Sequence, residues 1–190
     1  PVSHVRMSIY PDGGVSRIRL LAAFMAERDS ISLRPEPLTK ERFALYGDVI
    51  EASLENPDAM NEARFQRFDD LCDIDMGGGD VVISVARCRA PTTLPLRIDM
   101  VERHPRGSQA FIPMTAAPFL AIVAEGADAE PGRVHAFEVP AGTGINLHRN
   151  VWHGVLTPLH PPGLFAVIDR IGPGANLEEH WFTSPIRIEP

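Results

Sequence analysis

From about residue 80 the sequence breaks into short apolar or alternating runs, separated by turns rich in proline and glycine. DVVISVARC, FLAIVAEG and LFAVIDRIG have the length and spacing of strands in a sandwich or small barrel. A chain of 190 residues has the size of one ordinary domain. The pattern therefore predicts a mainly β fold with a single core.

Two elements precede these runs. In SHVRMSIYPDGGVSRIRLL, alternating residues flank Asp12-Gly13, which is typical of a β-hairpin because glycine accepts the positive φ of a tight turn. In LTKERFALYG, Thr39 is a candidate N-cap and Gly47 a candidate left-handed stop, which predicts one short helix. We expect an appended hairpin over 1–22, a linker over 23–36 and the main domain over 37–190.

Composition limits the partners. The net charge of −7 disfavours nucleic acid or an anionic membrane as the main partner. No run approaches the ~20 apolar residues of a membrane span, and the first residues lack the features of a signal peptide. Cys72 and Cys88 do not form a C-x-x-C pair, so we interpret them as reduced thiols of a cytoplasmic protein. Only Lys40 among the 18 basic residues is lysine; genome base composition or a preference for carboxylate ligands would both explain this.

Polar residues occur inside the β runs at two places. In VERHPRGSQAFIPM, Glu102 and His104 are two apart, so on a strand both point to the same face, and a turn leads to Gln109. With His148 they give two imidazoles, a carboxylate and an amide, a set that fits a catalytic divalent ion. The alternatives are a solvated strand and hydrogen-bonded structural histidines.

The second place is GINLHRNVWHG, residues 144 to 154. His148 and His153 are five apart, so in one uninterrupted strand they face opposite sides, and both point inward only if the chain bends near Asn150. The sequence contains no G-x-S-x-G, no H-E-x-x-H and no familiar Cys-His spacing. Covalent catalysis by serine or cysteine is therefore poorly supported.

Several of these segments resemble the ureidoglycolate lyase family, formerly called ureidoglycolate hydrolase. ERHPRGSQAFIPM, GTGINLHRNVWHGVL and FAVIDRIG resemble its signature segments, and PLTKERFALYGDVI resembles its first helix. The resemblance runs from about Pro37 to Asp169. It implies a cupin-like β-barrel, usually a homodimer, that splits ureidoglycolate into glyoxylate and urea in allantoin and purine breakdown.

The resemblance also implies site residues. Glu102, His104, Gln109 and His148 are similar to a cupin ligand set, with glutamate in place of the usual first histidine. This departure leaves the dependence on a divalent metal and its identity open, and no organic cofactor is expected.

The reaction requires a base for the substrate hydroxyl and a proton for the leaving nitrogen. Glu102, His104, His148 and His153 are the catalytic candidates, and His148 or His153 is the general base if no metal takes part. Arginines bind carboxylates through paired hydrogen bonds. The candidates for the substrate carboxylate are Arg87, Arg103, Arg149 and Arg170, and those for the urea end are Asn146, Ser108 and Gln109.

The N-terminal hairpin resembles a segment near the end of allantoicase, the enzyme that makes ureidoglycolate. About twenty residues match, too few for an allantoicase active site. Two other functions stay open: a cupin-type small-molecule sensor, and a metal-dependent cupin enzyme of another reaction class. Turnover separates the lyase from the sensor, and metal analysis with oxygen uptake identifies an oxygenase.

Overall fold

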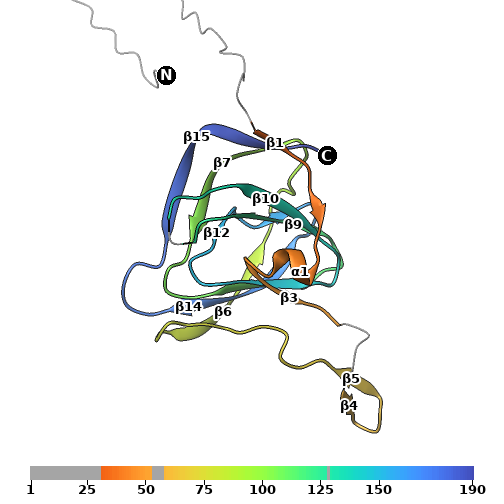
Figure 1. The fold of residues 1–190 in the computed structure, drawn as a ribbon. Coiled ribbons are helices and arrows are strands. Elements are labelled where there is room, and N and C mark those ends of the chain that lie inside the picture. The colour runs from red at the N-terminus through yellow and green to blue at the C-terminus, as the bar shows by residue number, and fades with distance from the viewer. Residues whose placement is uncertain (1–30, 53–57, 128) are drawn as a thin grey trace, which may run out of the picture.

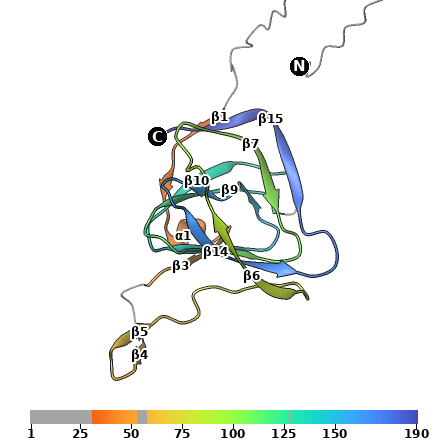
Figure 2. The ribbon, with the colours of Figure 1, turned by 180° about the vertical axis from the view of Figure 1, so that it is seen from behind.

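The computed structural model describes residues 31–52, 58–127 and 129–190 (Figure 1). The hairpin predicted over 1–22 lies outside these residues and stays a prediction. Strands dominate the described chain, and they form two curved sheets that face each other, as the front and back views both show (Figure 2). The predicted mainly β, cupin-like fold is confirmed.

The larger sheet holds eight of the described strands. Its main path includes the first and the last of the described strands, and β13 (Thr157–Pro158) lies off this path, paired with β9. In spatial order the strands are β1 (Ile31–Leu33), β15 (Glu178–Ile188), β7 (Leu96–Arg103), β12 (Trp152–His153), β9 (Phe119–Ala124), β10 (Val134–Val139) and β2 (Glu36–Pro37).

The smaller sheet has five described strands, and β6 is an edge strand with no second partner among the described residues. Its neighbours pair antiparallel throughout. In spatial order the strands are β3 (Gly47–Ile50), β11 (Gly144–Leu147), β8 (Gln109–Pro113), β14 (Leu164–Ile171) and β6 (Asp80–Arg87).

The main core lies between the two sheets. Phe111 and Phe165 of the smaller sheet are buried in one apolar cluster with Phe119, Val123 and Phe137 of the larger sheet. The opposite face of β9 is also covered, because the larger sheet curls so that its β15 end packs against Leu120 and Ile122. This double burial explains why β9 reads as an unbroken apolar run rather than an alternating one.

The described part of the predicted linker forms strand pairs with the larger sheet. β1 pairs in parallel with β15, and β2 pairs in parallel with β10. Residues 31–36, which we predicted to belong to the linker, therefore contribute to the larger sheet. The following helix α1 (Lys40–Phe43) begins at Thr39, whose Oγ1 accepts a hydrogen bond from the Arg42 backbone amide at 3.3 Å.

Gly47 does not have the left-handed conformation predicted for it. Its φ is not positive; instead, Gly47 is the first residue of β3 and pairs with Leu147. A Cβ at this position would lie 2.1 Å from the backbone oxygen of Asn146. Glycine is thus required here because two backbones approach closely, and not because the helix needs a left-handed stop.

Residues 58–79 lie outside the two main sheets. β4 (Asp58–Met60) and β5 (Phe65–Arg67) form a separate two-stranded sheet that projects away from the barrel (Figures 1 and 2). The chain then returns along the outer face of the smaller sheet, where the Ser108 amide donates to Asp75 O at 2.7 Å. The described residues include no helix with the length and apolar character that a membrane crossing requires.

Candidate active site

Three side chains converge at one end of the barrel. Glu102 lies on β7, His153 lies opposite it on β12, and His104 directly follows β7. One ligating atom from each residue lies within 4.8 Å of the other two. The structure brings Glu102 and His104 close together, and the third member of the cluster is His153.

Backbone carbonyls fix the tautomer of both histidines. His104 Nδ1 donates to Asn176 O at 2.6 Å, and His153 Nδ1 donates to Gly154 O at 3.1 Å. Because a carbonyl oxygen only accepts, each neutral ring carries its proton on Nδ1 and a lone pair on Nε2. Both Nε2 atoms are buried and have no hydrogen-bond partner among the described residues. Two bare lone pairs and a carboxylate are therefore presented together.

The chain bends between His148 and His153, as an inward-facing His153 requires. Asn150 has a φ of +70°, and its backbone amide donates to His104 O at 2.9 Å. This left-handed residue breaks the alternation, and His153 then joins Glu102 by direct pairing. His148, predicted as a metal ligand, instead has its Nε2 3.1 Å from Asp48 Oδ1.

Burial controls the charge state of the cluster. Complete burial, reinforced by His104, lowers the pKa of His153 to about 4. Burial also raises the pKa of Glu102; His104 opposes this effect, while Glu179 and Asp169 add to it. A neutral His153 keeps its Nε2 lone pair available at neutral pH. Asp169 was not among the predicted site residues. It could have been noticed in the sequence, because it is a charged residue inside the apolar strand LFAVIDRIG.

Strand alternation divides the predicted substrate-binding residues between two faces of the smaller sheet. Gln109 pairs with Leu147, a residue of the main core, and its Nε2 donates to Asp169 Oδ2 at 3.1 Å. Asn146 pairs with Ala110 and Asp48, so it points to the outer face. Gln109 therefore faces the barrel interior, whereas Asn146 and its neighbour Ser108 do not.

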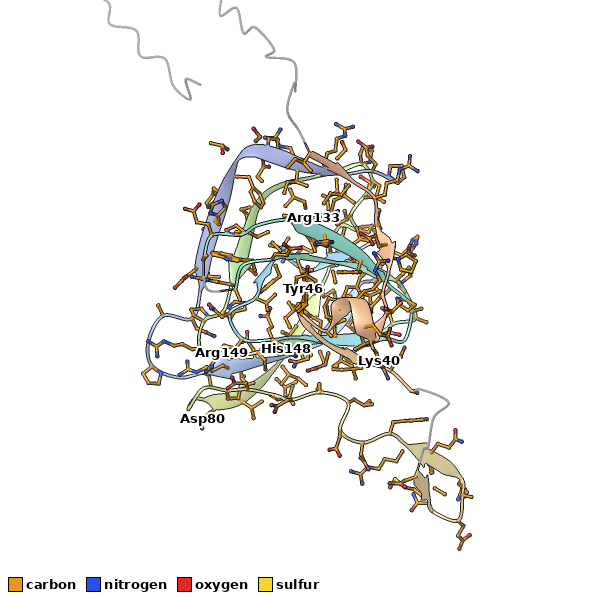
Figure 3. All side chains as sticks on the ribbon, viewed as in Figure 1. Lys40, Tyr46, Asp80, Arg133, His148 and Arg149 are labelled. Carbon is orange, nitrogen blue, oxygen red and sulfur yellow. The ribbon has the colours of Figure 1, made fainter. Side chains whose placement is uncertain are left out.

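A second polar cluster lies on that outer face. Asn146 Nδ2 donates to Asp48 Oδ2 and to Asp73 O, both at 2.9 Å. His148 and Arg149 lie side by side next to it (Figure 3). Burial alone would raise the pKa of Asp48, but hydrogen bonds from Asn146 and His148 hold it below its usual value. A cavity of about 340 Å³ adjoins this cluster and is lined by Asp73, Asp75, Ser108, His148 and Arg149.

The observed contacts of the arginines predicted to hold the substrate carboxylate are with groups other than the histidine pair. Arg87 is exposed at the end of β6, and Arg149 pairs with Asp75 at 3.4 Å. Arg103 pairs with Glu178 at 2.6 Å, and its guanidinium lies 4.4 Å from the ring centre of Trp152. Arg170 donates to the carbonyls of Met76 and Pro173, which ties the adjoining loops to β14.

The cluster of Glu102, His104 and His153 fits a divalent metal ion. Two imidazole nitrogens and one carboxylate are a common ligand set for a catalytic divalent ion. The buried Nε2 atoms without partners supply the observation that supports this fit. The structure thus groups His153, rather than His148, with Glu102 and His104.

Comparison with known proteins gives one consistent family. A family model described as ureidoglycolate lyase matches residues 30–189. The ureidoglycolate lyase of Chelativorans sp. (strain BNC1) is 48% identical over 155 residues, which cover 80% of this chain and 93% of that protein. That of Rhodobacter capsulatus is 49% identical over 156 residues, 81% of this chain and 96% of that protein. Ureidoglycolate lyase 2 of Rhizobium meliloti (strain 1021) is 45% identical over 160 residues, which cover 84% of this chain and 98% of that protein.

Proposed function

Because the chain belongs to the ureidoglycolate lyase family, we propose that it splits the C–N bond of ureidoglycolate to give glyoxylate and urea. This places the chain in purine and allantoin degradation. The observation that carries the proposal is the match over nearly the whole described chain, together with the acceptor cluster of Glu102, His104 and His153 in the barrel. The free thiols of Cys72 and Cys88 agree with a reducing, cytoplasmic location.

Glu102, His104 and His153 are the residues that would hold a divalent ion. Charge supports this assignment, because Glu102, Asp169 and Glu179 make the surroundings acidic and the substrate is itself a carboxylate. A bound dication offsets this repulsion. When bound, it would supply a Lewis acid that favours ionisation of the substrate hydroxyl.

The bond cleavage needs one proton removed and one delivered. The hydroxyl proton leaves as its oxygen becomes the carbonyl of glyoxylate, and the C–N electrons pass to the leaving urea nitrogen, which takes up a proton. In metal-free protein, His153 Nε2 is the candidate to accept the first proton, since it has no hydrogen-bond partner among the described residues. Its lowered pKa makes it a weak base but makes its imidazolium a ready proton donor. The imidazolium so formed returns that proton to urea. Such acid–base help is typically worth ~10²–10⁴-fold.

The proposed enzyme is a homodimer that pairs through β6. This edge strand presents Val81, Ile83 and Val85 to solvent, 58%, 69% and 64% exposed. Its charges, Asp80 and Arg87, stand at opposite ends. When two β6 strands pair antiparallel, Asp80 of one copy therefore lies at the same end as Arg87 of the partner subunit. With Ile83 on the twofold axis, Val81 lies opposite Val85 of the partner subunit. Unpaired apolar edges favour such strand addition.

Product analysis tests the proposed reaction. Racemic ureidoglycolate is incubated with metal-stripped protein and with metal-reloaded protein, and background decay is subtracted because the substrate is unstable. We expect urea and glyoxylate in equal amounts. Recovery of activity only on adding a divalent ion supports the metal assignment.

The same assay identifies the alternatives. Ammonia in place of urea would mean hydrolysis. Because two histidines and one carboxylate are also the ligands of non-haem iron oxygenases, oxygen uptake with Fe²⁺ is measured in parallel. No turnover above background would contradict an enzymatic function and favour a cupin-type sensor.

A further inference from the structure

The side-chain amide of Gln109 is held in one orientation. Its Nε2 donates to Asp169 Oδ2 at 3.1 Å across the neighbouring strands β8 and β14. Its Oε1 is buried and has no hydrogen-bond partner among the described residues. Burying an amide oxygen without a hydrogen-bond donor costs free energy, so the position of Gln109 Oε1 requires an explanation.

Asp169 dictates this orientation. An ionised carboxylate only accepts hydrogen bonds. One of its oxygens, Oδ1, accepts from the Arg170 backbone amide at 2.7 Å, which leaves Oδ2 for Gln109. If the amide were flipped, two oxygens would face each other. Asp169 thus forces Gln109 to offer nitrogen to the carboxylate and to leave its oxygen free.

The free oxygen belongs with the histidine pair. Gln109 pairs with Leu147, and Leu147 lines the same small interior cavity as His153, so Gln109 enters the barrel on the side of this cluster. The electrostatic effect of Asp169 on both His153 and Glu102 agrees with this placement. His104 Nε2 and His153 Nε2 also lack donors among the described residues. Several hydrogen-bond acceptors without donors therefore lie together at this end of the barrel. They cannot hydrogen-bond to one another, whereas a bound cation satisfies all of them.

We propose that Asp169 is a positioning residue that turns Gln109 Oε1 toward the cation site of Glu102, His104 and His153. This inference rests on the metal site proposed above. An amide oxygen is a usable metal ligand, whereas an amide nitrogen has no available lone pair, so the orientation decides whether Gln109 takes part. Partners that orient ligands are typically worth 10–100-fold in metal affinity.

The test measures binding of Co²⁺ alone to the full-length chain, by calorimetry and by the visible spectrum of the ion. Asp169→Asn keeps the shape of the side chain but supplies a donor, so Gln109 flips and presents nitrogen to the site. We expect Co²⁺ to bind about 10–100-fold more weakly. Adding Gln109→Glu to that variant offers an oxygen in either orientation and restores affinity to within a few-fold.

Asp99→Asn is the matched control, since Asp99 is 46% exposed and pairs with Arg97 on the strand surface. It should bind Co²⁺ as the unmodified chain does. The proposal is overturned if Asp169→Asn binds Co²⁺ normally, or if the double variant binds as weakly as Asp169→Asn alone while both melt cooperatively. If the unmodified chain binds no Co²⁺, the metal site itself is wrong, and urea formation by metal-free protein separately decides the proposed reaction.

Discussion

The rings of His104 and His153 lie 5.2 Å apart between centroids, and each is anchored through Nδ1 to a backbone carbonyl. Neither ring can turn without breaking its anchor, so the two Nε2 lone pairs behave as one preorganised acceptor unit. The chain brings them together from β7 and β12, two adjacent strands of the larger sheet.

Replacing His153 separates its role from that of His148. His153→Gln removes an Nε2 lone pair beside Glu102, and we expect urea formation to fall by ~10²–10⁴-fold, with a parallel loss of Co²⁺ affinity. His148→Gln changes a partly exposed partner of Asp48 and should leave Co²⁺ affinity nearly unchanged. Loss of metal binding in His148→Gln, with retention in His153→Gln, would reinstate the ligand set predicted from the sequence.

The sequence predicts which residues lie close together more reliably within one strand than across a turn. Glu102 lies near the end of β7 and His104 directly follows this strand, so alternation alone placed them together. The choice between His148 and His153 depended on the φ of +70° at Asn150. Non-glycine residues adopt that conformation uncommonly, so spacing could not decide it.

Alternation also carried information that the prediction did not use. Ser108 directly precedes Gln109, the first residue of β8, and the side chains of these neighbours bond to different parts of the chain. Both were nevertheless assigned to the urea end of one substrate site. The register of β8 with β11 places Gln109 inside and Asn146 outside. The partners of Asp48 and Asp169 could not be found from spacing, because each meets its partner through long-range strand pairing.

Asp48 makes the stability of the chain depend on pH. Although burial opposes it, hydrogen bonds from Asn146 and His148 lower the pKa of the folded carboxyl group. Its contribution is therefore fully present above the unfolded pKa of about 3.9 and is lost as pH falls through the lower folded value. Relative to the unmodified chain, Asp48→Asn should unfold about 1–3 kcal/mol more easily near pH 7. Urea denaturation should show that difference shrinking below about pH 4; a difference that grows instead would contradict the assignment.

Gly47 tests the close approach of β3 and β11. A Cβ there would lie 2.1 Å from Asn146 O and 2.9 Å from Phe43 Cε1, so Gly47→Ala must displace backbone. We expect a loss of about 3 kcal/mol or more in the free energy of unfolding. Gly78→Ala is the control: φ is +80° but nothing lies within 4 Å, so strain alone should cost about 1–2 kcal/mol. Equal losses in the two variants would refute the steric explanation.

The exposed edge of β6 predicts the state of association. Ile83→Lys places a charge at the twofold axis, where two copies would bring two ammonium groups together in a desolvated row, so the dimer should dissociate. Val155→Lys changes an apolar residue of similar exposure, 56%, away from this strand and should leave the mass unchanged. Light scattering after size exclusion gives the mass, and circular dichroism shows that both variants remain folded. If the Ile83→Lys variant is still dimeric, β6 is not the dimer interface. If the unmodified chain is monomeric, the proposed dimer is wrong, and the apolar side chains of β6 are simply exposed to water.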